Sequence, residues 1–108
     1  MEFINHIELA GVVGRVRIQQ VVDRIVANIS LITEECYKDN SSCAVIETTW
    51  HNVVAWQSAD MPSLDSIERG SHLNVQGRLR ARRYSDANGD SHILYEVVAA
   101  SIRLIPND

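Results

Sequence analysis

Residues 72–84, HLNVQGRLRARRY, carry a period of two. One parity holds the polar, cationic and aromatic side chains, namely His72, Asn74, Gln76, Arg78, Arg80, Arg82 and Tyr84. The other parity holds Leu73, Val75, Gly77, Leu79, Ala81 and Arg83. Successive side chains of a strand point to opposite faces, so this alternation predicts a strand with one apolar face and one wet face rich in arginine.

This cationic stretch belongs to a chain that is acidic overall. The 108 residues carry ten Lys and Arg against fourteen Asp and Glu, for a net charge of −4. Four of the ten basic groups lie in residues 72–84, which contain no acid. The balance excludes a general polycation, but a local cluster of arginines can still attract an anion. A charged face that is merely solvated is the ordinary alternative, because antiparallel sheets often keep one face wet.

The same period recurs along the rest of the chain. Alternating or β-branched stretches, each expected to form a strand, occupy residues 3–12, 25–37, 45–56 and 92–105. Residues 57–69 break the alternation, and Leu64 and Ile67 there predict one short helix capped by Ser63. Gly70 is expected to stand just past the end of that helix.

Turn signals connect these stretches. YKDNSS at residues 37–42 joins the second strand to the third, and the Asn-Gly pair of DANGD at residues 86–90 predicts a hairpin between the last two. Residues 11–24 are expected to form a loop after the first strand, in which Arg15 and Arg17 place positive charge.

The order of three strands, a helix and two strands within 108 residues predicts an all-β fold, a five-stranded OB barrel with one short helix between strands three and four. An SH3-like barrel lacks the interposed helix, and an immunoglobulin-like sandwich usually has more strands. We expect one domain spanning residues 1–108.

Four aromatic side chains lie among polar neighbours. Trp50 and Trp56 share one face of the third strand, Tyr84 shares its face with arginines, and Tyr37 stands beside Lys38 at the mouth of a loop. Large aromatic residues usually pack in a core and hydrogen-bond through their polar tips. Four of them on neighbouring strands, interleaved with Arg and Lys, fit better a platform on which unpaired bases stack.

Nothing in the sequence indicates catalysis. The four histidines fall on four different stretches, and there is no nucleophile elbow, no P-loop and no metal-ligand spacing. Asp86, Asp90 and Glu96 gather near the last turn, where we interpret them as a solvated hairpin. We therefore expect a binding protein without a cofactor or a metal.

Two further features concern the cellular compartment. Cys36 and Cys43 form no CxxC motif and follow no secretory signal, so two free thiols are expected. The N-terminus, MEFINHIELAGVVG, lacks the basic segment of a signal peptide. No stretch approaches the roughly 20 apolar residues of a membrane span. We expect a cytoplasmic protein.

Several segments together resemble one known family. TTWHNVVAW (residues 48–56), ERGSHLNVQGRLRARRY (68–84) and SDANGD (85–90), with ANISLIT (27–33), are similar in order and spacing to motifs of the bacterial single-stranded-DNA-binding protein family. The similarity extends from Asn5 to about Leu104. It implies an OB fold that assembles as a homo-oligomer, a tetramer or a dimer, and binds single-stranded DNA regardless of sequence in replication, recombination and repair.

The resemblance also implies functional residues. The family's base-stacking aromatics fall on Tyr37, Trp50, Trp56 and Tyr84. Phosphate contacts are expected from the cations of the same regions, namely Lys38, Arg78, Arg80, Arg82, Arg83, Arg15 and Arg17. His51 falls at a family position associated with subunit contacts, although a histidine buried inside the barrel is the alternative. Asn5 and Ile7 lie on a strand edge that could pair with a second copy.

Some positions depart from the family pattern. His6 and Ser58 stand where lysines are common, which removes two phosphate contacts. The chain stops at IPND without a long tail and acidic tip, either because a tail has been trimmed or because the protein is a natural minimal member. In the second case we expect no tail-mediated recruitment of replication proteins. Association with the nucleoid is implied by the resemblance alone. A second hypothesis stays open: a primosomal-type OB assembly partner with weak or no DNA binding. Retention of all four aromatics argues against it.

Overall fold

The computed structural model describes residues 1–106, which contain five strands and one short helical turn. The elements are β1 (Ile7–Val21), β2 (Arg24–Lys38), β3 (Ala44–Trp56), η1 (Leu64–Ser66), β4 (His72–Ser85) and β5 (Ser91–Leu104). The strands close into a barrel in the order β1-β2-β3-β5-β4. The predicted five-stranded OB barrel, with its helical element between the third and fourth strands, is confirmed.

Strand β1 closes the barrel by changing partners along its length. Its first half pairs with β4 from Ile7 to Val12, and its second half pairs with β2 from Val12 to Val21. The register shifts by one residue between Val13 and Arg15, which marks a bulge at Gly14. Bulges bend a strand and increase its twist, as a strand that serves two sheets requires.

The barrel interior is filled by the apolar parity of the strands. Buried side chains alternate along β2, β3 and β4 at Ala27, Ile29, Leu31, Val53, Ala55, Leu73 and Val75. Leu64 of η1 and Ile67 just after it belong to the same buried cluster. Burial of each large aliphatic side chain stabilises the fold by about 1.5–3 kcal/mol, so this cluster holds the barrel together.

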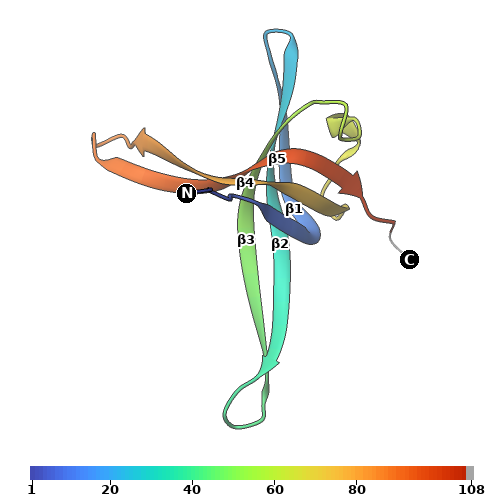
Figure 1. Ribbon diagram of the computed structural model, residues 1–108, viewed down its shortest axis with the longest axis vertical. Helices are drawn as coiled ribbons and strands as arrows, with labels where there is room; N and C mark the ends of the chain where they lie inside the picture. Colours follow the sequence, from blue (N-terminus) through green and yellow to red (C-terminus); the bar gives the residue numbers. More distant parts are fainter. Residues whose placement is uncertain (107–108) are drawn as a thin grey trace.

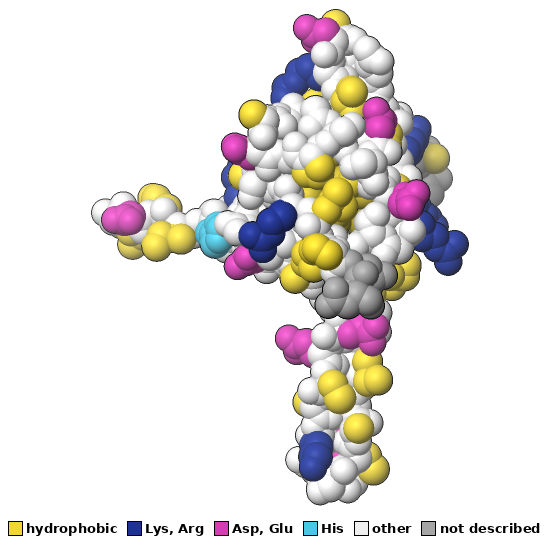
Figure 2. Space-filling model, turned by 90° about the vertical axis from the view of Figure 1, so that its right-hand side faces the viewer, with side chains coloured by type: hydrophobic (Ala, Val, Ile, Leu, Met, Phe, Trp, Pro, Cys, Tyr) yellow, Lys and Arg dark blue, Asp and Glu magenta, His cyan; other side chains and the backbone are white. Residues whose placement is uncertain are grey.

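Three hairpins extend beyond the barrel (Figure 1). In that view the β1–β2 hairpin points to the top, the β2–β3 hairpin to the bottom and the β4–β5 hairpin to the left. Figure 2 shows the β2–β3 hairpin as a narrow arm that carries apolar side chains. With these projecting hairpins, the molecule measures 54 × 42 × 38 Å along its three principal axes.

The first strand differs from its prediction at both ends. Residues 3–6 precede β1, and residues 13–21, which we expected to form a loop, make up its second half. The loop prediction was wrong because this segment also alternates: Val16 and Ile18 are half-buried, whereas Arg15 and Arg17 are exposed. These two arginines therefore project from a strand.

The predicted helix is reduced to a single 3-10 turn. Leu64 and Ile67 are its buried anchors, and a spacing of three places them on one side of such a turn. The Ser63 side chain makes no capping hydrogen bond; instead the Leu64 N–H donates to the Gln57 Oε1 at 2.8 Å. Gly70 has a φ of +92°, but it lies in the turn that leads into β4.

The alternation of β4 buries side chains only where the strand lies in the barrel. Leu73 and Val75 are buried, whereas Leu79 and Ala81 are exposed. The apolar side is not buried along the whole stretch, because β4 loses its β1 partner after Gly77 and beyond Leu79 continues with β5 as a two-stranded ribbon (Figure 1). The open apolar side of this ribbon carries Leu79, Ile93 and Tyr95.

Candidate nucleic-acid interface

The outer faces of β1, β2 and β3 form one continuous surface. The strand register produces two rows across it, one of Arg17, Asn28 and Val54, and the next of Arg15, Ser30 and Asn52. Each row places a cation on β1 and a polar amide or hydroxyl group on β2. Among residues 1–106, Arg15 and Arg17 form no ion pair, so their charges are available to an anion.

Two neighbouring cavities, of about 260 and 330 Å³, lie over this surface. They share four lining residues, Asn28, Val54, Arg82 and Glu96, and we treat them as the two halves of one central groove. Arg15 and Arg17 line one half, and Arg80 and Trp56 line the other. Arginines thus stand on both sides of the groove, from β1 on one side and from β4 on the other.

Trp50 lies beyond Asn52 on the same face of β3 and is 59% exposed. Its ring reaches over β1: a Cβ atom placed on Gly14 would lie only 2.4 Å from the Trp50 Cζ3. The missing side chain at Gly14 therefore makes room for the indole. The ring is supported by the sheet and open to solvent, as a base-stacking surface requires.

Trp56 lines the other half of the central groove, at the end of β3. The guanidinium carbon of Arg24 lies 4.7 Å from the centre of its ring. This is a cation–π contact, which positions the indole and adds a cation beside it. Val54 and Asn52 separate the two tryptophans, so the groove has one indole towards each end.

Glu96 lies beneath the two arginines of β4, and its side chain is only 4% exposed. Its Oε1 accepts hydrogen bonds from Arg80 Nη2 at 2.6 Å, from Arg80 Nε at 3.2 Å and from Arg82 Nε at 3.1 Å. Our interpretation of Glu96 as a solvated hairpin carboxylate was wrong, because β5 places it opposite Arg80 where the ribbon meets the barrel. Two of the predicted phosphate-binding arginines thus share an internal counter-charge.

Tyr84 lies further out on the ribbon, on the same strand parity as Arg82. Its ring stacks on His92, with centroids 5.3 Å apart and planes 27° from parallel. The His92 Nε2 lies 2.6 Å from the Asp86 Oδ2. This hydrogen bond, together with those from backbone N–H groups of the loop, holds the pKa of Asp86 below its ordinary value. One face of Tyr84 is therefore covered, which leaves the other for a base.

The remaining predicted DNA contacts lie apart from the central groove. Tyr37 and Lys38 are exposed at the tip of the β2–β3 hairpin, where the Tyr37 hydroxyl donates to Glu47 at 3.2 Å. Strand parity places Tyr37 on the face opposite Trp50. Arg83 likewise projects from the opposite face to Arg82. The groove thus brings together Arg15, Arg17, Arg80, Arg82 and Trp56 with Trp50 beside it, but not Tyr37, Lys38, Arg78, Arg83 or Tyr84.

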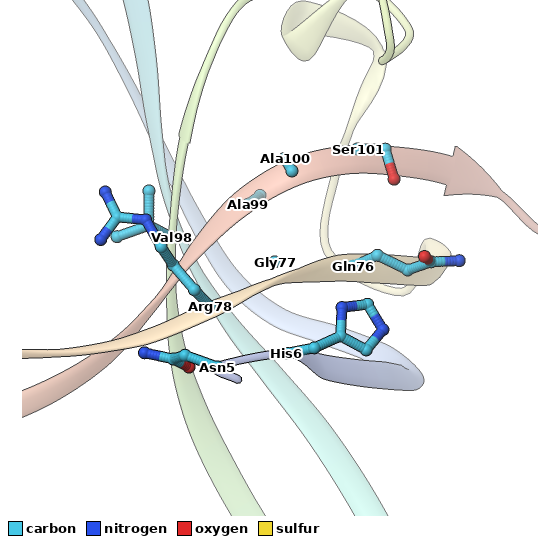
Figure 3. Close-up of a pocket in the computed structure, with 9 residues that line it drawn as sticks. All are labelled: Asn5, His6, Gln76, Gly77, Arg78, Val98, Ala99, Ala100 and Ser101. Atoms are coloured by element: carbon cyan, nitrogen blue, oxygen red, sulfur yellow. The ribbon is translucent and has the colours of Figure 1, made fainter. Parts of the chain in front are cut away.

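Arg78 lines a separate cavity of about 390 Å³ between the N-terminal segment, β4 and β5 (Figure 3). Asn5 lies at its edge and ties this segment to β4. The Asn5 side chain donates to the Leu79 carbonyl at 2.8 Å and accepts from the Leu79 N–H at 2.9 Å. Asn5 therefore extends the β1–β4 ladder through its side-chain amide.

The other two candidates for subunit contact are Ile7, at the start of β1, and His51, on β3. Ile7 begins the segment of β1 that pairs with β4, and within the described part of the chain residues 7–11 have no partner on their second edge. His51 is half-buried, and its Nε2 lies within hydrogen-bonding distance of the Thr33 Oγ1, at 2.7 Å. The second edge of residues 7–11 therefore offers backbone groups that no other described strand pairs with.

Sequence reasoning missed several groups that shape the groove: Gly14, Arg24, Asn28 and Glu96. If the residues of β2 and β3 are paired outward from the turn between them, Asn28 lies opposite Val54. Because Val54 shares a face of β3 with Trp50 and Trp56, this pairing could have placed Asn28 next to the tryptophans. Gly14 and Arg24 carry no such signal, because their contacts with Trp50 and Trp56 depend on how the strands twist in space.

Among residues 1–106, no cluster of three His, Cys, Asp or Glu side chains could hold a metal ion, and no helix is long and apolar enough to cross a membrane. Cys36 and Cys43 are free and exposed.

The protein resembles known proteins over nearly its whole length. The chain is 30% identical over 106 residues to the Chlorobaculum tepidum single-stranded DNA-binding protein 1, covering 94% of this chain and 65% of that one. It is 26% identical over 80 residues to the Neisseria meningitidis single-stranded DNA-binding protein, covering 74% of this chain and 46% of the relative. It thus spans between about half and two thirds of the length of these curated relatives.

Solved structures show the same fold. Plasmodium falciparum SSB, solved in a complex with ssDNA, superposes with a TM-score of 0.84 at 24% identity, over 98% of both chains. A deletion mutant of the Thermus aquaticus single-stranded DNA binding protein superposes with a TM-score of 0.78 at 19% identity, over 95% of this chain and 51% of that one. The model of the single-strand binding protein family matches residues 4–105. Since this match covers almost the whole chain, the protein belongs to the single-strand binding protein family.

Proposed function

We propose that this protein binds single-stranded DNA without sequence preference and protects exposed strands during replication, recombination and repair. The observation that carries the proposal is the central groove, which has arginines on both sides and Trp56 in its lining, with the exposed Trp50 beside it on the same face of β3. The names of the relatives support the same ligand. A binding role of this kind needs no catalytic group.

In this proposal two kinds of interaction bind the DNA strand, base stacking and ion pairing with phosphates. Bases stack on Trp50 and Trp56, and each stacked base is worth about 1–3 kcal/mol whatever its identity. The phosphates pair with Arg15 and Arg17, which releases condensed counterions and makes the affinity depend on salt. Tyr84 on the β4–β5 ribbon and Tyr37 on the β2–β3 hairpin offer further aromatic surface to DNA that extends beyond the groove.

The geometry favours a single strand over a duplex. Paired bases are stacked on one another and offer only their edges, so they cannot stack on an indole. The amides of Asn28 and Asn52 lie in the groove, but each can donate and accept, so they discriminate little between bases. The groove is therefore suited to unpaired DNA of any sequence.

A competition experiment tests this proposal. A labelled oligo(dT) bound to the protein should be displaced by unlabelled single strands of mixed sequence and not by the same sequence as a duplex. Equal displacement by single strand and duplex would contradict the role of base stacking. Displacement by only one base composition would contradict the lack of sequence preference.

We also propose that the protein forms a homo-oligomer through the free edge of β1, with Asn5, Ile7 and His51 at or near the contact. The unpaired second edge of residues 7–11 supports this, since an open edge offers backbone groups to a second chain. The molar mass from light scattering should then equal a dimer or tetramer. A monomeric mass at micromolar concentration would contradict the proposal.

One observation favours the assembly-partner hypothesis. The β4–β5 ribbon exposes Leu79, Ile93 and Tyr95 on the face opposite to Arg80 and Arg82, and an open apolar surface is suited to another protein. Replacing these three side chains by alanine should leave DNA binding unchanged if the ribbon contacts DNA only through the face that carries Arg80 and Arg82.

A further inference from the structure

The groove contains one acidic group that DNA binding alone does not explain. The Glu96 carboxylate lines both halves of the central groove, where a phosphate is expected, and a negative charge there repels a phosphate. Yet it is almost completely buried, and three N–H groups from two arginines converge on its Oε1.

The contacts leave donors free on both arginines. A guanidinium carries five N–H donors. Arg80 uses Nε and Nη2 for Glu96, and Arg82 uses Nε. Both side chains are partly exposed, at 39% and 51%. Each can therefore donate to a phosphate while it remains bonded to Glu96.

The charges of this cluster are also coupled. Two guanidinium groups and one carboxylate sum to a single positive charge. Separating a buried carboxylate from its partners leaves an unpaired charge away from water, which is strongly unfavourable. The arginines are thus unable to turn freely from Glu96 towards the DNA.

We propose that Glu96 is a positioning residue that makes Arg80 and Arg82 act as one monovalent phosphate site. It holds the two guanidinium groups at the side of the groove and cancels one of their charges. The pair then offers two oriented donor groups but neutralises only one phosphate. This inference rests on the proposed binding of single-stranded DNA.

The salt dependence of binding measures this directly. For single strands the slope of log K against log salt concentration is about −0.7 per phosphate neutralised. The pair should contribute about −0.7 in the wild-type protein. Without the Glu96 charge it should contribute about twice that, so the slope should steepen by about 0.7.

The test compares Glu96→Gln with wild type in titrations of oligo(dT) between low and high salt. The ratio of variant to wild-type affinity should fall about fivefold for each tenfold rise in salt. Glu96→Asp, which keeps the charge, should retain the wild-type slope. Glu68→Gln, at an exposed position outside the groove, changes the net charge equally and should also retain it.

A slope of Glu96→Gln equal to that of Glu68→Gln would overturn the inference, even if the affinity changed. A wild-type protein that binds no oligo(dT) would instead contradict the proposed function, so the two failures are distinguishable. If thermal melting shows that Glu96→Gln does not fold, Glu96→Met removes the same charge with an apolar side chain of similar volume.

A measurement without any substitution gives a second test. The Nε–H signals of Arg80 and Arg82 in a nitrogen–proton NMR spectrum should stay in their hydrogen-bonded positions when oligo(dT) saturates the protein. Signals that move to the positions of solvent-exposed arginines would show that DNA displaces Glu96, which would overturn the inference.

Discussion

At the scale of single residues, the contact between Trp50 and Gly14 sets the position of an exposed indole ring. The indole occupies the space that any side chain at Gly14 would need, since an added Cβ would lie 2.4 Å from Cζ3 and 2.7 Å from Cη2. Both are atoms at the far end of the ring, so the ring can move aside without a large change in the barrel.

We predict that Gly14→Ala displaces the Trp50 ring and weakens binding of oligo(dT), while the loss of folding free energy stays within about 1–3 kcal/mol. The tryptophan emission spectrum, a thermal melt and a binding titration report the three effects. Gly11→Ala serves as a comparison. Its Cβ would lie 2.2 Å from the Ile32 carbonyl oxygen, so the backbone must move, and we expect a larger loss of stability than in Gly14→Ala. Unchanged emission and affinity in Gly14→Ala would contradict this role.

In the proposed mode of binding, base stacking and phosphate contacts should make separable contributions to the affinity. Trp50→Ala should weaken binding by about 1–3 kcal/mol and leave the salt slope nearly unchanged, because it removes a base contact. Arg17→Ala should instead make the slope shallower by about 0.7, because Arg17 has no ion pair to neutralise it in residues 1–106. Titrations at several salt concentrations measure both. Identical behaviour of the two variants would refute this division.

At the scale of elements, the β2–β3 and β4–β5 hairpins close with five-residue loops of the same kind. In the β2–β3 loop the Asp39 Oδ1 accepts from the N–H groups of Ser41 and Cys43. In the β4–β5 loop the Asp86 Oδ1 accepts from the N–H groups of Asn88 and Asp90. The fourth loop residue has positive φ in both, at 64° for Ser42 and 83° for Gly89.

We predict opposite effects from exchanging the fourth residues. Gly89→Ser should destabilise its hairpin by about 1–2 kcal/mol, because an L side chain is strained at positive φ. Ser42→Gly should stabilise the β2–β3 hairpin by less, since glycine also adds about 0.4–1 kcal/mol of unfolded-state entropy. Amide exchange in each loop measures the effects. A loss of stability in Ser42→Gly would show that Ser42 is not strained.

The Asp86–His92 contact makes the β4–β5 hairpin sensitive to acid. The pKa of Asp86 is lower in the folded chain than its ordinary value, chiefly because of the hydrogen bond with His92. Asp86 therefore stabilises the fold above the ordinary carboxyl pKa, and this contribution disappears as the pH falls through the depressed value. The Asp86 carboxyl carbon shift, followed by NMR, should titrate lower in wild type than in His92→Ala. Equal midpoints would contradict the assignment to His92.

At the scale of the whole molecule, the order of the expected elements predicted the barrel, and strand parity predicted which side chains share a face. The alternation in residues 72–84 fixes which side of β4 carries arginine, and the even spacing from Trp50 to Trp56 places both indoles on one face of β3. These features are local, because a pleated strand determines them whatever surrounds it.

Features that depend on distant partners could not be read in this way. Alternation does not show where a strand leaves the barrel, so it places Leu79 on the apolar side of β4 without revealing that Leu79 is exposed. It also does not show which charges meet across strands, so Glu96 was assigned to solvent. The resemblance likewise implied base-stacking roles for the aromatic residues but did not indicate the contact between Trp56 and Arg24.

The central claim is that single-stranded DNA binds across the face that carries Trp50 and Trp56. The most direct test is a tryptophan-fluorescence titration of the wild-type protein with oligo(dT), at low and at physiological salt. We predict deep quenching that saturates, that needs more DNA at higher salt, and that a duplex does not produce. A folded protein whose emission stays unchanged on addition of oligo(dT) at low salt would contradict the account.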